Sequence, residues 1–189
     1  MRVGEIISEP LQAQVDVPGL NSLGIEQLAL DLVRDERNEP NQVLIVSASS
    51  SVLESEMPAK VKAWLLPLEH PDAKLQAQHD RYRRGQPFQW SESNLRPEVL
   101  TPETRLELKP IPGERDHYEL HSFRYEAEPG RQLYVRVERG LESFGGYVLG
   151  DTVERILSVP EFPRELSILH QGSLLAMSGE PLQVRIELS

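Results

Sequence analysis

Two histidines, His117 and His121, have a spacing that could serve metal chemistry, because they lie four residues apart. On a helix, that spacing would bring two imidazole rings to one metal ion. The residues around them alternate as in a β-strand, where the two rings would face one side about 13 Å apart. That distance is too long for shared coordination. We therefore expect a structural or surface role for both histidines and no metal site.

The other patterns that could perform chemistry are incomplete. Ser, His and Asp all occur, but the chain has no G-x-S-x-G motif, and the serines at 49–51 follow a strand, as in a turn or a hydrogen-bonded edge. The acidic residues Asp31, Asp35 and Glu36 lack the spacing and central glycine of a calcium loop. The absence of cysteine excludes disulfides, thiolate metal sites and cysteine nucleophiles within this chain. We expect no catalytic residues, no cofactor and no enzyme activity.

A glycine pair, Gly145 and Gly146, is the most specific local feature. The pair does not extend into a phosphate-binding motif. We expect a structural turn in which glycine supplies a positive φ or allows a close backbone approach, with Phe144 and Tyr147 packed on either side. The alternative is a contact surface for a neighbouring domain, to which Phe144, Tyr147 and Trp90 would contribute.

The two tryptophans carry separate expectations. Trp64 is out of phase with the apolar residues around it, so either it lies on the less buried face of its strand or a bulge shifts the register. Trp90 lies beside Phe88 in a polar segment and is expected to pin that segment to the sheet. The alternative is an exposed aromatic set, formed with Tyr147, that binds carbohydrate or cell wall.

Short strands between turn signals dominate the chain. Fifteen prolines and twelve glycines separate the apolar runs, which favours short strands over long helices. We expect about seven antiparallel strands, the pattern of an all-β sandwich. They are expected at 25–32, 43–46, 61–68, 106–108, 118–125, 132–139 and 152–159, with a hairpin turn at 34–41.

Three segments are expected along the chain. Residues 1–22 form one strand-like segment, at 11–17, that leads in or belongs to a preceding domain. Residues 23–160 form the sandwich, interrupted at 69–104 by an irregular or partly helical insertion with a short helix around 73–83. Residues 161–189 follow a proline-rich joint and carry runs at 166–168, 174–177 and 182–188. They are either extra strands or the start of the next domain.

The composition limits the classes of partner. The 189 residues have a formal net charge of -10, which argues against a broad basic surface and so against nucleic-acid binding. The basic run at 81–84 is expected to be a solvated loop, because no second basic cluster supports it. No apolar run approaches the ~20 residues of a membrane span, and the first residues do not form a signal peptide, so no direct membrane insertion is expected.

Several segments together resemble the N-terminal part of bacterial alpha-2-macroglobulins, over about residues 23–179. No single motif is a chemical signature, and the resemblance lies in the ordered combination. The segments are AWLLP at 63–67, LHSFR at 120–124, LESFGGYVL at 141–149, SVPEFPREL at 158–166 and GSLLAMSG at 172–179.

This resemblance implies a macroglobulin-type domain, similar to a fibronectin type III module, within a protease inhibitor. In that family a string of such domains forms a cage around a protease, and a separate thioester domain with Cys-x-Glu-Gln reacts with it. The present chain has no cysteine and so cannot carry the thioester. The resemblance also implies neighbouring macroglobulin domains as partners, proteases and a penicillin-binding protein as partners of the full-length protein, and a periplasmic, lipoprotein-anchored setting in host defence.

Overall fold

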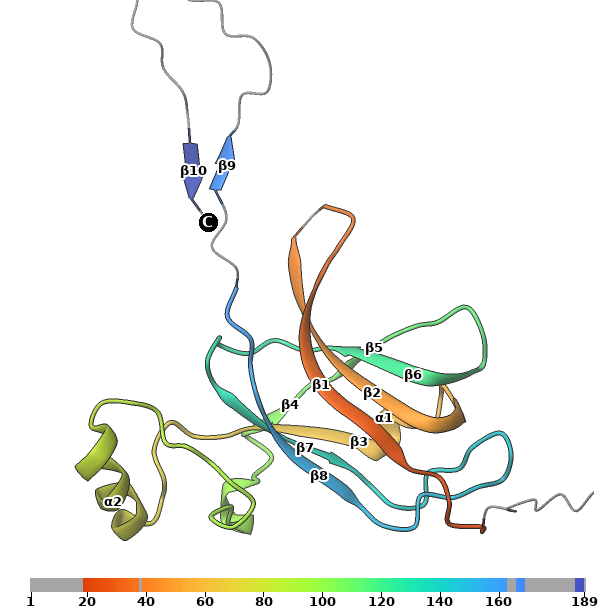
Figure 1. The fold of residues 1–189 in the computed structure, drawn as a ribbon, viewed down its shortest axis with the longest axis horizontal. Coiled ribbons are helices and arrows are strands. Elements are labelled where there is room, and N and C mark those ends of the chain that lie inside the picture. The colour runs from red at the N-terminus through yellow and green to blue at the C-terminus, as the bar shows by residue number, and fades with distance from the viewer. Residues whose placement is uncertain (1–18, 38, 163–165, 169–185, 189) are drawn as a thin grey trace, which may run out of the picture.

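Two four-stranded antiparallel sheets pack face to face in the computed structural model (Figure 1). The structure describes residues 19–37, 39–162, 166–168 and 186–188. The antiparallel β-sandwich expected from the sequence is therefore confirmed. The strand-like runs expected at 11–17 and 174–177, and most of the run at 182–188, lie outside the described residues.

The first sheet has the strand order β1-β2-β6-β5. It consists of β1 (Ile25–Arg34), β2 (Pro40–Leu53), β5 (Lys109–Ile111) and β6 (His117–Arg124). Strand β2 runs through the serines at 49–51, so the expected end of this strand near residue 46 is wrong. Its extension is stabilised because Ser49 N donates to Gly24 O (2.9 Å), and its register with β6 shifts in this region.

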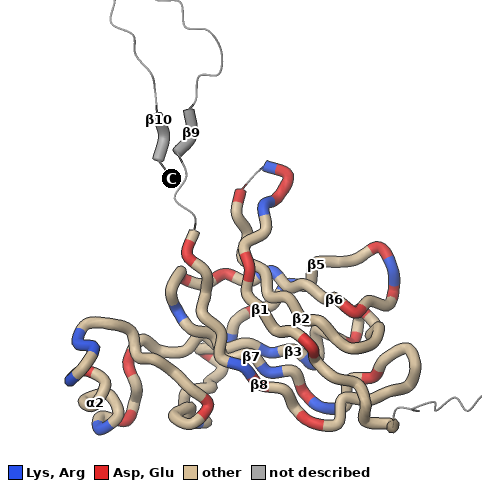
Figure 2. Tube along the Cα trace, viewed as in Figure 1, with Lys and Arg blue, Asp and Glu red and all other residues tan. Residues whose placement is uncertain are grey.

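The expected hairpin turn at 34–41 is confirmed between β1 and β2. The carboxylate of Asp35 accepts hydrogen bonds from the backbone N–H groups of Arg37 and Glu39, both at 2.9 Å. These bonds hold the pKa of Asp35 below its usual value. Figure 2 shows charged residues of both signs at this tip.

The second sheet has the strand order β4-β3-β7-β8. It consists of β3 (Val61–Leu65), β4 (Arg105–Leu106), β7 (Gln132–Val137) and β8 (Val153–Ser158). The single strand expected at 106–108 is in fact split into β4 and β5, which belong to different sheets. The described sandwich therefore has eight strands rather than about seven, because the chain crosses from one sheet to the other between Leu106 and Lys109.

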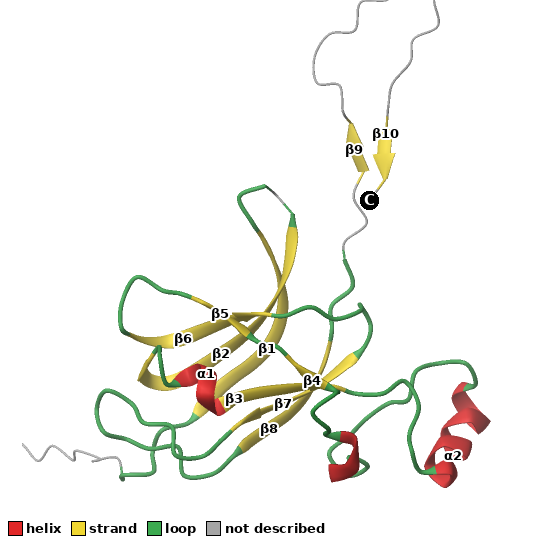
Figure 3. Cartoon of the chain, turned by 180° about the vertical axis from the view of Figure 1, so that it is seen from behind, coloured by secondary structure: helices red, strands yellow, loops and turns green. Residues whose placement is uncertain are grey.

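The insertion at 69–104 contains α2 (Ala73–Arg83) and the short helix η1 (Pro97–Val99), next to the second sheet (Figure 3). The helix expected around 73–83 is confirmed. It begins at Asp72, whose side chain accepts a hydrogen bond from Lys74 N (2.8 Å) and so caps the first turn. A second helix, α1 (Met57–Lys60), was not expected, because a single turn has too few residues to show helical periodicity.

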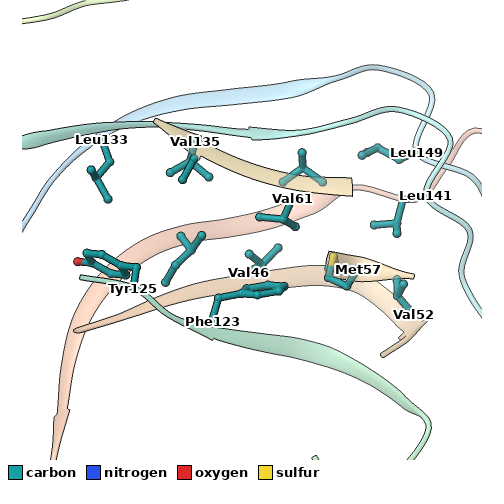
Figure 4. Close-up of a cluster of buried hydrophobic side chains, with 14 of the residues drawn as sticks. Val46, Val52, Met57, Val61, Phe123, Tyr125, Leu133, Val135, Leu141 and Leu149 are labelled. Carbon is teal, nitrogen blue, oxygen red and sulfur yellow. The ribbon is translucent and has the colours of Figure 1, made fainter. Parts of the chain in front are cut away.

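The main core fills the space between the sheets (Figure 4). Inward residues on β3 and β7 alternate with outward ones, as expected for half-buried strands. Val135 on β7 and Val46 on β2 are 0% exposed and face this core from opposite sheets. The side chain of Met57, also 0% exposed, places α1 against the same core.

Two further strands, β9 (Leu166–Ile168) and β10 (Ile186–Leu188), form an antiparallel pair. Within the described part of the chain, each of them pairs with the other and with no strand of the two larger sheets. The expected segment boundaries at 22, 69–104 and 160 stay predictions.

Candidate functional site

The glycine turn is a small hairpin closed around one buried side chain. Ser143 N donates to Tyr147 O (2.8 Å), and Gly146 N donates to Ser143 O (2.9 Å). The Ser143 hydroxyl, in a residue only 5% exposed, also accepts a hydrogen bond from Tyr147 N (3.1 Å). Gly146 has φ of +77°, a conformation that favours glycine. At Gly145 a Cβ would lie 3.1 Å from the ring of Tyr147, so this residue permits a close approach.

Gly146→Ala is expected to lower the free energy of unfolding by about 1–2 kcal/mol, because an L side chain is strained at a positive φ. Urea denaturation followed by tryptophan fluorescence measures this change. Gly24→Ala is the matched control, since its Cβ would make only an ordinary 3.8 Å contact with Ser49. Equal stability of Gly146→Ala and the parent would contradict this role for the turn.

Backbone hydrogen bonds attach this turn firmly to the sandwich. Phe144 N donates to Ser51 O in β2, and Val148 N donates to Leu20 O, both at 2.8 Å. The ring of Phe144 nevertheless remains 77% exposed and meets the His117 ring edge-on at 4.8 Å. Only Tyr147 packs against the core, so Phe144 does not take the packed position expected for it. A rigid turn thus presents an exposed aromatic ring.

Trp90 lies inside the molecule and holds the insertion onto the second sheet. It is 6% exposed, its Nε1 donates to Pro67 O (2.8 Å), and its backbone N donates to Gln132 Oε1 (2.9 Å). The expected pinning role is confirmed. The prediction that Trp90 contributes to a contact surface or a carbohydrate site is wrong, because its ring is buried within the insertion.

Trp64 lies on the outer face of β3, where its ring packs against Tyr134 at 5.6 Å between centroids. Of the two alternatives, the bulge is wrong, because β3 pairs with β7 without a register shift. Trp64 lies on the face opposite Val61 and Ala63, as the other alternative expected, but it is only 8% exposed. The insertion covers this part of the outer face and turns it into a second core. Its buried residues are Trp64, Leu66, Phe88, Trp90, Val99 and Tyr134.

His70 organises the insertion, a role that the sequence did not reveal. Its ring is 4% exposed and lies 4.8 Å from the Phe88 ring and 4.9 Å from the Trp90 ring. Asp72 N donates to His70 Nδ1 (2.9 Å), and Nε2 donates to Asn94 O (3.0 Å). Both ring nitrogens are therefore committed to backbone atoms of the insertion.

Arg136 forms the most connected charged group on the second sheet. Its guanidinium donates to Glu154 Oε1 (3.0 Å) and to Tyr134 Oη (3.2 Å), and lies over the Trp64 ring at 5.8 Å. Burial raises the pKa of Tyr134 to about 12. These groups satisfy one another, which indicates a structural network rather than a reactive site.

His117 and His121 both lie on β6, in different surroundings. His117 contacts the exposed ring of Phe144, whereas His121 is 5% exposed and donates from Nε2 to Tyr118 O (3.0 Å). Among the described residues, no three His, Cys, Asp or Glu side chains are placed to hold a metal ion. In the same residues, no helix has the length and apolar character needed to span a membrane.

Known proteins with related sequences carry one family name. No family model matches the chain. The chain is 32% identical over 166 residues to the alpha-2-macroglobulin homolog of Yersinia pestis, covering 88% of this chain. It is 23% identical to the alpha-2-macroglobulin of Rickettsia conorii and 24% identical to that of Pasteurella multocida, over 87% and 89% of this chain. The chain is a domain of the bacterial alpha-2-macroglobulin family.

The alpha-2-macroglobulin resemblance expected from the sequence is thus confirmed. The chain spans about 8% of the length of each of these relatives. A crystal structure of native alpha-2-macroglobulin from Escherichia coli, spanning domains MG0-NIE-MG1, overlaps 80% of this chain and 36% of that chain, with a TM-score of 0.43 and 11% identity. This TM-score and this identity are too low to support the family assignment, which rests on the relatives found by sequence.

The stability of this alpha-2-macroglobulin domain is expected to fall as the pH drops below about 6.5. Burial lowers the pKa of His121, an effect that its bond to Tyr118 O and the charge of Glu54 partly oppose. The unfolded chain therefore takes up a proton at a higher pH than the folded domain does. Between the two pKa values, this group alone removes up to about 1.4 kcal/mol of unfolding free energy per pH unit.

His121→Gln tests this pH dependence, since an amide can still donate to Tyr118 O. Urea denaturation between pH 7.5 and pH 5 should show a shallower loss of stability for the variant than for the parent. Identical slopes would contradict the role assigned to His121.

Proposed function

We propose that this domain is a non-enzymatic structural and interaction domain of an alpha-2-macroglobulin-type protease trap. The observation that carries the proposal is the 32% identity to the Yersinia pestis homolog over 88% of the chain. The two-sheet frame suits a mechanical role, because its buried core and hydrogen-bonded loops hold surfaces at fixed positions. Covalent capture of a protease would belong to a different, cysteine-containing part of the protein, since this chain has no cysteine.

The end of the sandwich that carries the glycine turn is the proposed contact with the preceding part of the full-length protein. The exposed ring of Phe144 lies in this turn, and Leu20, 69% exposed, is bonded to the same turn through Val148. The chain enters the sandwich beside it (Figure 1). Two large exposed apolar side chains next to the entering chain favour a domain contact there.

The proposed setting is the bacterial periplasm, with a lipoprotein anchor on the full-length protein and a role in host defence. Proteases and a penicillin-binding protein are proposed as partners of that full-length protein. A carbohydrate-binding function has no support, because Trp64 and Trp90 are both buried.

Photo-crosslinking tests the domain contact directly. A p-benzoyl-phenylalanine side chain that replaces Phe144 of this chain within the full-length protein should crosslink to the part of the same polypeptide that precedes this domain. Position 82 is the matched control, since Tyr82 is 79% exposed but lies in the insertion. The proposed contact is wrong if position 144 gives no intramolecular crosslink, or gives the same products as position 82.

A further inference from the structure

A groove between β5, β6 and the loop that joins them is a second candidate surface. Its volume is about 280 Å³. Leu120 and Ile111 are 55% and 40% exposed, so the groove displays apolar side chains to solvent. Its apolar walls are formed by Pro58, Pro110, Ile111, Pro112, Tyr118 and Leu120.

His121 and Glu54, which line this groove, each carry a hydrogen-bond acceptor. His121 lines it, and Nε2 of this ring donates to Tyr118 O (3.0 Å), so the neutral ring keeps a lone pair on Nδ1. The carboxylate of Glu54 also lines it and accepts from Gly113 N (3.0 Å) through one oxygen. A ligand that carries a hydrogen-bond donor would satisfy both the carboxylate and the neutral imidazole.

The surroundings of the groove are acidic. On the side of the joining loop, Glu114, Asp116 and Glu119 are exposed, with one cation, Arg115, between them (Figure 2). Lys109 and Arg124 lie at the other end of β5 and β6, where they pair across the two strands. An adjacent groove of about 320 Å³ continues past Glu54 and Asp116. An approaching cation would therefore meet a negative potential.

We propose that this groove binds an extended segment of a partner protein through a lysine or arginine side chain. This inference goes beyond the scaffold role. The aliphatic stem would pack against the prolines and Leu120, as such stems do on apolar surfaces. The cationic head would lie at Glu54 and His121, where a charge-assisted hydrogen bond can form. An uncharged apolar side chain would instead bury these acceptors without a donor, which is unfavourable.

The size of the groove supports a side chain as its occupant. Small-molecule sites typically enclose about 300–1,000 Å³. The groove, at about 280 Å³, lies just below that range, which is enough room for one long side chain.

Three labelled peptides test the proposal by fluorescence polarisation against the 189-residue chain. The first alternates valine with lysine, the second replaces lysine with norleucine, and the third replaces it with glutamate. We expect saturable binding of the lysine peptide, at least about tenfold weaker binding of the norleucine peptide, and none of the glutamate peptide. Added salt should weaken binding of the lysine peptide.

Variants locate the binding in the groove. Glu54→Gln keeps an acceptor for Gly113 N but loses the charge, and Leu120→Ser removes an exposed apolar contact. Each substitution should weaken binding of the lysine peptide several-fold and leave the urea unfolding midpoint near that of the parent. Leu68→Ser is the control, because Leu68 is 46% exposed and lines a separate groove beside Gln76. Equal binding of the norleucine peptide, an equal loss in Leu68→Ser, or no saturable lysine-peptide binding would overturn the proposal.

Discussion

Val135→Asp is expected to lower the free energy of unfolding by about 4 kcal/mol or more, a large part of the stability of a typical domain. Val135 is 0% exposed and lies at the centre of the main core, paired with Ala63 on β3 and Arg155 on β8. An aspartate there would bury a carboxylate among apolar side chains, because the backbone pairing directs this position inward. Urea denaturation and near-UV circular dichroism measure the loss.

Val33→Asp is the matched control for this substitution. Val33 lies on β1 and is 48% exposed, so the same change should alter stability by about 0.5 kcal/mol or less. If Val135→Asp unfolded at the same urea concentration as Val33→Asp, the register of β7 would be wrong. Val135→Ala should fall between the two, since it creates a cavity without a charge.

Trp90→Ala should lower the free energy of unfolding by about 3–5 kcal/mol. If the insertion detaches from the sheet before the sandwich unfolds, the loss of unfolding free energy should be smaller. The substitution removes a ring from the second core and deletes the hydrogen bond to Pro67 O. Trypsin sensitivity in the basic run at 81–84 reports on release of the insertion, and urea denaturation reports on the whole domain. Both measurements should change in the same variant.

Two further variants separate the ring from its hydrogen bond. Trp90→Phe keeps an aromatic ring and loses the Nε1 donor, so it should cost only about 1–2 kcal/mol. Tyr82→Ala, at an exposed position of α2, should leave stability and the onset of insertion cleavage near those of the parent. Unchanged trypsin sensitivity and unchanged stability in Trp90→Ala would show that Trp90 does not hold the insertion.

Local sequence patterns identified most of the strands and α2, because the signals lie within the elements themselves. Asp72 caps α2 and the strand alternation around Val135 reports a buried face, so both were predictable. The split into β4 and β5 was not, since a change of sheet depends on what each short strand pairs with. The extension of β2 through the serines likewise depends on bonds to Gly24, which is distant in sequence.

The candidate sites were harder to predict than the fold. Trp64 and Trp90 could be exposed or buried on sequence alone, and only the insertion packed over the second sheet decides the outcome. The groove beside β6 was missed because Glu54, Pro110 and Leu120 come from separate parts of the chain. The glycines mark the turn that carries Phe144 in the sequence, but the exposure of its ring was not predicted.

Trypsin activity with two substrates tests the central proposal, that this domain is part of a trap without being the trap. The full-length protein should lower hydrolysis of casein by trypsin and leave hydrolysis of a short chromogenic peptide nearly unchanged, because a cage excludes only large substrates. The isolated 189-residue chain should lower neither. Saturable inhibition of trypsin by the isolated chain, or unhindered casein hydrolysis with the full-length protein, would contradict the proposed role.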